Sequence, residues 1–278
     1  MKYLAAKENL KTANIVLLGI PFDATSSFRS GSRFAPDTIR TSSDVLETFS
    51  PYLNFDIEDI DFFDYGNIYI TINNFNVLNE QLRELILSFL SKGKKVIAIG
   101  GEHLVTLPIV TAYFEKYPDL LLIHLDAHAD LRDKYFNEKF SHATVIRRIA
   151  DFLPLNRIFQ FGIRSGTKEE FDFAKKNTNF YPFSIDINNE ILEKFKNKKI
   201  YLTIDMDVLD PSIFPGTGTP EPGGVFFNDL IKFFQKIYGL EIVGADVVEL
   251  SPHYDASGVS SITAAKIIRE LLIIANKR

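Results

Sequence analysis

The chain contains no cysteine among its 278 residues. It therefore cannot form a disulfide, a thiolate metal ligand or a cysteine nucleophile. It also lacks any stretch approaching the roughly 20 consecutive apolar residues that a membrane-spanning helix needs. Its first ten residues do not have the apolar core of a secretory signal. We expect a soluble cytoplasmic protein that does not bind membranes.

The chain also has no excess of basic residues over acidic ones. Lysine and arginine number 31 against 36 aspartates and glutamates, so the net charge is −5 and the isoelectric point is near 5.6. The lysines are scattered along the chain, and a phosphate backbone would feel no long-range attraction. We do not expect nucleic acid as a partner. The acidic balance suits a small cationic substrate, although solubility alone explains it more simply.

Apolar, β-rich runs alternate with helix-like segments for most of the length. The runs lie at about residues 14–20, 59–63, 95–99, 120–125, 157–162, 180–184, 199–204 and 241–248. Helical spacing of apolar residues is clearest at 80–90, 104–117 and 260–275. This alternation predicts an α/β protein with three αβα layers and a mostly parallel sheet of about eight strands. No shift in composition marks a boundary, so we expect a single domain over residues 1–278.

Short polar runs follow three of the predicted strands. In a strand, residues i, i+2 and i+4 point to the same side, and the carboxyl ends of parallel strands border the ligand crevice of an open sheet. Side chains that are distant in the sequence are therefore expected to meet there. The candidates are His103, Asp126, His128, Asp130, Asp205 and Asp207.

These candidates favour a metal site. Carboxylates crowded at strand ends repel one another unless a cation lies between them. Six oxygen and nitrogen ligands exceed what one ion uses, which predicts a two-metal hydrolytic centre. Alternatives remain for individual residues. His103 by itself is as typical of a turn as of a ligand, and Asp205 and Asp207 can instead begin a turn.

Other polar residues near these runs have two interpretations each. His124 lies inside an apolar run, which favours a core residue or a partner of a metal ligand. His142 is either the neighbour of a helix cap or a catalytic acid. Asp210 suits a turn, and residues 211–224 form a loop rich in proline and glycine. Glu249 ends a strand and is either a substrate anchor or a solvated terminus.

Taken in order, these segments resemble the ureohydrolase family, which contains arginase and agmatinase. The resemblance runs from about residue 14 to the C-terminus and lies in residues 100–103, 126–130, 141–142, 205–211 and Glu249. Within the family the chain looks like the agmatinase branch. The segments similar to that branch are 19–23, 30–36, 161–165 and 215–221.

Some residues bear on the substrate. Arginases have a Thr/Ser/Asn-rich loop that holds the amino-acid end of arginine, and this chain lacks such a loop between Asp130 and His142. Its absence argues against a substrate with an α-carboxylate. The chain also has Glu-His-Leu at 102–104 where Asp-His-Ser is more familiar, and Ala143 where many relatives have glycine. These departures leave the ligands intact and the exact substrate open.

The resemblance implies an arginase/deacetylase-like fold and the hydrolysis of agmatine to putrescine and urea, a step of polyamine biosynthesis. It implies two Mn²⁺ ions held by the six candidate ligands, and an oxygen-rich set of this kind suits manganese better than zinc. Asp130 would also accept a proton from the attacking hydroxide, His142 would shuttle a proton and Glu249 would hold the guanidinium. A homo-oligomer, trimeric or hexameric, is expected.

Several alternatives to agmatine hydrolysis stay open. A related ureohydrolase acting on aminopropylagmatine, guanidinobutyrate or arginine is one alternative within the family. A deacetylase-like amidohydrolase is a second class, but its adjacent histidine pair does not occur in this sequence. A non-catalytic guanidine-binding subunit is a third.

Overall fold

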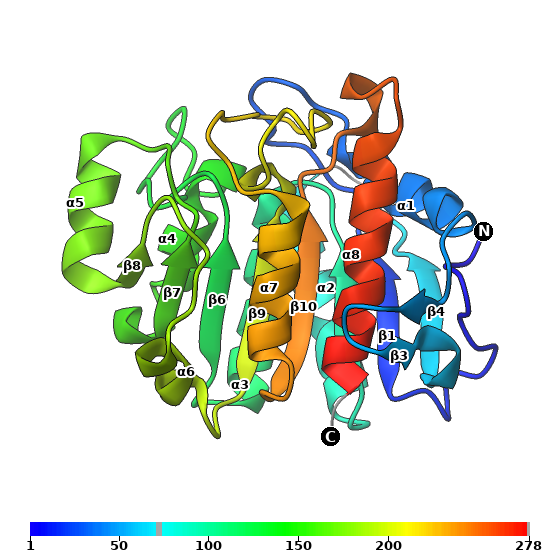
Figure 1. Ribbon diagram of the computed structural model, residues 1–278. Coiled ribbons are helices and arrows are strands. Elements are labelled where there is room, and N and C mark those ends of the chain that lie inside the picture. Colours follow the sequence, from blue (N-terminus) through cyan, green and yellow to red (C-terminus); the bar gives the residue numbers. More distant parts are fainter. Residues whose placement is uncertain (71–73, 277–278) are drawn as a thin grey trace.

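The structure is a computed structural model that describes residues 1–70 and 74–276 (Figure 1). Its centre is an eight-stranded sheet with the order β4-β1-β5-β10-β9-β6-β7-β8, in which all neighbouring strands are parallel. The strands are β1 Ile15–Gly19, β4 Phe62–Asn67, β5 Lys95–Ile99, β6 Leu121–Leu125, β7 Ile158–Phe161, β8 Asn179–Tyr181, β9 Ile200–Asp205 and β10 Ile242–Val248. A separate antiparallel pair is formed by β2 Phe49–Ser50 and β3 Phe55–Asp56. The predicted parallel sheet is confirmed.

Helices cover both faces of the sheet (Figure 1). Strand side chains alternate between two apolar cores: Ile15 and Leu17 face one, while Val16 and Leu18 face the other. The first core is completed by α1 Ala35–Ser43, α6 Asn189–Phe195, α7 Phe227–Ile237 and α8 Val259–Asn276. The second is completed by α2 Phe75–Leu90, α3 Thr106–Lys116, α4 Val145–Ile149 and α5 Lys168–Asn177. The three-layer prediction is therefore confirmed.

Short 3-10 helices mark many of the turns between these elements. They are η1 Ser32–Phe34, η2 Ile57–Asp59, η3 His103–Val105, η4 His142–Thr144, η5 Leu155–Arg157, η6 Met206–Val208 and η7 Pro252–Tyr254. One of them shifts a predicted strand. The run at 59–63 corresponds to β4, which begins only at Phe62, because the Asp56 side chain caps η2 by accepting a hydrogen bond from the Glu58 backbone. None of the helices within the described residues combines the length and apolarity needed to cross a bilayer.

The sheet order determines where the polar runs meet. Strands β5, β10, β9 and β6 are consecutive neighbours in the middle of the sheet, and each is followed by a candidate site residue. The glycines before His103 are needed for close approach: a Cβ on Gly101 would collide with the backbone of Phe22. Neither Gly100 nor Gly101 has a positive φ, so close packing rather than a left-handed backbone is what requires glycine here.

Candidate metal centre

The structure brings all six predicted ligands together above the middle of the sheet. The Nδ1 atom of His103 lies 3.1 Å from Asp126 Oδ2, 3.2 Å from Asp130 Oδ2 and 3.3 Å from Asp205 Oδ2. The Nδ1 atom of His128 lies 3.0 Å from Asp207 Oδ2 and 3.6 Å from Asp126 Oδ1. Asp126 thus belongs to both groups, one around each histidine. Two overlapping groups of this kind provide a place for two neighbouring cations.

The tautomer of His103 tests whether a cation fits. Thr203 donates its hydroxyl proton to Asp246 at 2.6 Å, so it is available to accept a hydrogen bond from His103 Nε2 at 3.0 Å. This assignment places the ring proton on Nε2 and a lone pair on Nδ1. Within the described residues His103 Nδ1 is buried and has no hydrogen-bond partner. Three carboxylates around this atom call for a positive charge. A metal ion bound by the lone pair of the neutral ring supplies it, as a proton on Nδ1 does when no metal is bound, so the donor set fits a metal ion.

The charge balance leads to the same conclusion. Burial, reinforced by the charge of Asp126, raises the pKa of Asp130 to about 7. Burial and the charge of Asp207 raise the pKa of Asp205 well above its usual range. Burial acts to lower the pKa of His103, but the surrounding carboxylates outweigh it and raise that pKa well above normal. The cluster holds more negative charge than its own side chains neutralise.

His124 supports the cluster from behind. Its Nε2 lies 2.7 Å from Asp126 Oδ2, and its Nδ1 lies 3.2 Å from the Nε2 of Gln160. Gln160 Nε2 is a donor, so His124 Nδ1 accepts and His124 Nε2 donates to Asp126. A ring that donates to a candidate ligand orients that ligand. The arrangement agrees with the interpretation of His124 as a partner of a metal ligand.

Two candidate residues have a left-handed backbone. The φ angle is 53° at Asp130 and 67° at Glu249. Non-glycine residues rarely adopt this conformation, and it persists where the surroundings fix it. The Asp130 carbonyl accepts a hydrogen bond from Arg147 at 3.0 Å, and the Glu249 amide donates to the Gly101 carbonyl at 2.8 Å. These bonds hold both carboxylates at the cluster.

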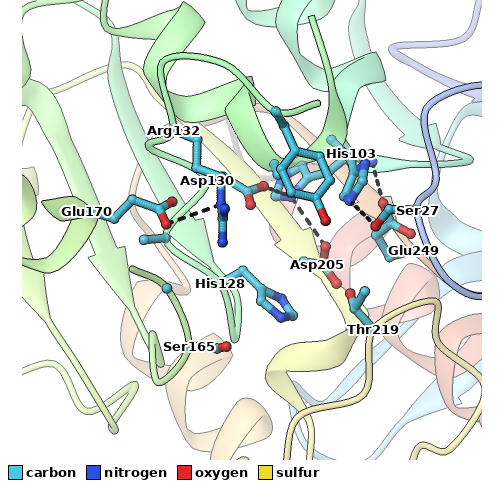
Figure 2. A pocket seen from close by; sticks show the side chains of 15 residues that line it. Ser27, His103, His128, Asp130, Arg132, Ser165, Glu170, Asp205, Thr219 and Glu249 are labelled. Carbon is cyan, nitrogen blue, oxygen red and sulfur yellow. Dashed lines mark hydrogen bonds and ion pairs between the residues drawn. The ribbon is translucent and has the colours of Figure 1, made fainter. Parts of the chain in front are cut away.

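A cavity of about 250 Å³ opens beside the cluster. Figure 2 shows Arg132 and Glu170 on one side of it, Ser27 and Glu249 on the other, and His128 between them. Glu249 is 6% exposed, and its Oε1 accepts a hydrogen bond from the His103 amide at 2.8 Å. Burial, helped by the charge of Glu102, raises the pKa of Glu249 well above its usual range. Within the described part of the chain Glu249 forms no ion pair with lysine or arginine, so a cationic ligand would complete it.

His142 lines the same cavity. Ser141 caps η4 in a capping box with Thr144, and the His142 ring lies 3.3 Å from Ser27 Oγ through Nε2 and 3.2 Å from Ser141 Oγ through Nδ1. Burial lowers the pKa of His142 to about 4, so the ring is neutral at pH 7. His142 is thus the neighbour of a helix cap, as one of the two interpretations expected, and it also faces the pocket; its role as a catalytic acid stays a prediction.

The loop at 211–224 is attached to the cluster by a residue that the sequence did not single out. Arg164 donates to the carbonyl of Asp207 at 2.6 Å and to that of Glu221 at 2.7 Å. The loop thereby places Thr219, whose hydroxyl donates to Asp207 Oδ2 at 3.3 Å. Asp210 accepts hydrogen bonds from the amides of residues 212, 223 and 224, as expected of a turn aspartate.

Thr203 and Asp246 are also absent from the predicted site. Each is a buried polar residue within an apolar strand. A carboxylate in the middle of such a strand signals a buried hydrogen-bond partner, but it does not identify that partner. Only the pairing of β9 with β10 brings Thr203 beside Asp246 and under His103.

Comparison with known proteins supports this geometry. A family model described as the Arginase family matches residues 13–274. The agmatinase of Bacillus subtilis is 43% identical over 275 residues, covering 98% of this chain and 95% of the relative. The crystal structure of agmatine ureohydrolase of Thermoplasma volcanium is similar with a TM-score of 0.87 at 34% identity, covering 99% of this chain and 94% of that chain. The guanidinobutyrase of Pseudomonas aeruginosa is 32% identical over 99% of this chain and 90% of its own length.

Proposed function

The chain belongs to the arginase family, and we propose that it hydrolyses agmatine to putrescine and urea at a centre of two manganese ions. One observation carries the proposal. A cavity of about 250 Å³ is lined both by the carboxylate and imidazole cluster and by Glu249, a buried carboxylate without a lysine or arginine partner among the residues that the structure describes. This arrangement suits a guanidinium held next to a source of hydroxide.

The metal ligands we propose share one environment of converging oxygen and nitrogen atoms. They are His103, Asp126, His128, Asp130, Asp205 and Asp207. Asp126 belongs to both groups, so it would contribute to holding both ions. Four carboxylates and two imidazoles suit Mn²⁺ better than the thiolate-rich or three-histidine sets typical of zinc. Bound together, two such ions lower the pKa of a water molecule enough to supply hydroxide near neutral pH.

The chain's own side chains position the substrate and move protons. Glu249 Oε1 accepts one hydrogen bond from the His103 amide, and each carboxylate oxygen has lone pairs left to accept the planar N–H groups of a guanidinium. This orientation fixes the guanidinium carbon relative to the cluster. Asp130 accepts the proton that the nucleophile loses. His142, neutral at pH 7, would relay a proton to the departing amine, so the proton that the nucleophile gives up to Asp130 is the one that the product amine gains.

The far side of the cavity supports a substrate without a carboxylate. Arg132 is the one arginine among the lining residues of this cavity, and no lysine lines it. Its Nε lies 3.4 Å from Glu170 Oε2, and its guanidinium lies over the Tyr135 ring. The positive charge of Arg132 is therefore already matched. A carboxylate tail, as in arginine or guanidinobutyrate, would have to break this pair.

The test is urea release by the purified protein from agmatine, arginine, guanidinobutyrate and aminopropylagmatine, each with and without added Mn²⁺. We expect the highest kcat/KM for agmatine, and loss of activity after treatment with a chelator that added Mn²⁺ reverses. A preference for guanidinobutyrate would contradict the substrate assignment. Binding of agmatine without urea release under every metal condition would contradict the enzyme itself.

A further inference from the structure

A buried carboxylate without a cation lies directly before His103. Glu102 is fully buried, and within the described residues it has no ion pair with lysine or arginine. Three hydrogen bonds satisfy it instead. It accepts from the Thr25 amide at 2.8 Å, from the Thr25 hydroxyl at 2.7 Å and from the Ser26 hydroxyl at 3.2 Å. All three donors come from one short segment, so Glu102 ties that segment to the end of β5.

The same segment contacts His142 from two sides. The His142 amide donates to Thr25 Oγ1 at 3.0 Å, and the His142 ring nitrogen Nε2 lies 3.3 Å from Ser27 Oγ. Because the Thr25 hydroxyl proton is donated to Glu102, its oxygen is left to accept the His142 amide. The polarity of the chain from His142 through Thr25 to Glu102 is therefore fixed.

Residues 23–31 form a strap across this side of the pocket, and its far end is also fastened. Asp23 accepts from the Gly31 amide at 2.9 Å, and Ser251 donates its hydroxyl proton to the Arg29 carbonyl at 3.2 Å. Ser27, in the middle of the strap, lines the cavity beside Glu249. Within the described residues, the hydrogen bonds from the strap itself to the end of β5 are those to the Glu102 side chain. The Glu102 amide also donates to the carbonyl of Phe22, just before the strap, at 2.8 Å.

We propose that Glu102 and Thr25 are positioning residues for turnover, which hold the His142 imidazole towards the pocket through the strap at residues 23–31. The proposal rests on the proposed function, since it assigns His142 a part in the reaction. Neither Glu102 nor Thr25 lines the cavity, so both act through His142 and Ser27. The glutamate side chain is long enough to reach the Thr25 amide and hydroxyl of the strap.

A double-mutant cycle between Thr25 and His142 tests this. Thr25→Val removes the hydroxyl at nearly constant volume, and Thr25→Ser keeps it. Thr25→Val removes the two partly buried hydrogen bonds of the hydroxyl, to Glu102 and from the His142 amide. We expect it to lower kcat about tenfold, with a smaller change in KM and wild-type Mn²⁺ content. Thr25→Ser should restore kcat. In a His142→Ala background Thr25→Val should have no further effect, because the residue through which it acts is gone.

Controls separate this role from a general loss of structure. Thr38→Val makes the same substitution at a half-buried threonine of α1, whose hydroxyl donates to the carbonyl of the N-cap residue Phe34, and should leave kcat unchanged. A second readout uses the metal-free protein with ¹⁵N-labelled histidine. The His142 ring resonances should move in Thr25→Val and in Glu102→Gln but not in Thr38→Val.

Three outcomes would contradict the positioning role. The first is an unchanged kcat in Thr25→Val. The second is an equal fall in kcat when this substitution is made in the wild-type and His142→Ala backgrounds. The third is loss of Mn²⁺ from the Thr25→Val protein. A wild-type protein that released no urea would instead refute the proposed function, and the histidine resonances would still report whether the strap positions the ring.

Discussion

Two buried charge clusters in this protein differ in how they are balanced. Arg40 and Asp64 are almost fully buried and form two hydrogen bonds, of 2.8 and 2.9 Å. Asp64 accepts two further bonds from the amides of Tyr3 and Gly66, and Arg40 donates to the side chain of Asn67. In the cluster above the sheet, by contrast, carboxylates surround two histidines without any lysine or arginine partner in the described residues.

This difference in charge balance distinguishes a cluster that stabilises the fold from one that binds a ligand. Burial acts to raise the pKa of Asp64, but the bonds and charge of Arg40 outweigh it and the pKa lies below its usual value of 3.8. The pKa of Asp205 moves in the opposite direction, because burial raises it and the charges of Asp207 and Asp126 add to that rise. A buried cluster that satisfies itself stabilises the fold, whereas one left with excess charge binds a ligand that supplies the missing charge.

The largest expected effect breaks the unbalanced cluster. His128→Ala should abolish both Mn²⁺ binding and urea release, because it removes the ring nitrogen next to Asp207 and Asp126. Metal content of the purified variant and urea release from agmatine are the measurements. His253→Ala, at an exposed imidazole, is the matched control and should behave as wild type. Full Mn²⁺ content in His128→Ala would remove His128 from the ligand set.

His142→Ala should separate turnover from metal binding. The ring lies in the pocket but contacts serine hydroxyls rather than the carboxylates. We expect kcat to fall by about 10² to 10⁴, the range for loss of a proton-transfer group, while Mn²⁺ content stays at the wild-type level. If Mn²⁺ fell as far as in His128→Ala, the proton-shuttle role would be wrong.

Arg40→Met breaks the balanced cluster. It leaves Asp64 buried without its cation, which should lower the free energy of unfolding by about 3–5 kcal/mol. Urea denaturation measures this, and kcat per folded molecule should not change. Arg83→Met is the control: its partner Glu115 and Arg83 itself are 38% and 39% exposed, so the same substitution should cost less than about 1 kcal/mol. Equal costs at the two sites would show that burial does not distinguish the pairs.

The smallest expected effect is the pH dependence of the difference in unfolding free energy between the wild-type protein and Arg40→Met. Because the folded pKa of Asp64 is depressed, its contribution is complete above the unfolded pKa and is lost as pH falls through the folded pKa, below 3.8. In Arg40→Met, burial without Arg40 should raise the pKa of Asp64. Asp64 then becomes neutral on acidification, which removes the free-energy cost of its buried charge in the variant. The difference in unfolding free energy should therefore shrink by about 1 kcal/mol or more on acidification. Measuring both proteins in chelator keeps the metal cluster equal, and a constant difference would contradict the coupling.

Local patterns were sufficient to predict most of the fold and the candidate ligands. Strand runs buried on both faces, such as Leu121–Leu125, are apolar at successive positions and stand out from amphipathic helices. The helices α2, α3 and α8 were predicted because their apolar residues recur at helical spacing. The lysine- and glutamate-rich α5 and the short α6 were not singled out, since their stability comes from capping and packing that periodicity does not reveal.

The sequence by itself determined the sheet, its parallel direction and the six side chains at strand ends, because side-chain alternation and burial are properties of neighbouring residues. Only the tertiary structure decided that β5, β10, β9 and β6 are adjacent, that Thr203 and Asp246 fix the tautomer of His103, and that Arg164 and Glu102 fasten the covering loops. These contacts join residues far apart in the chain. Strand order and the pairing of buried polar atoms depend on the packing of the whole molecule, which no local pattern encodes.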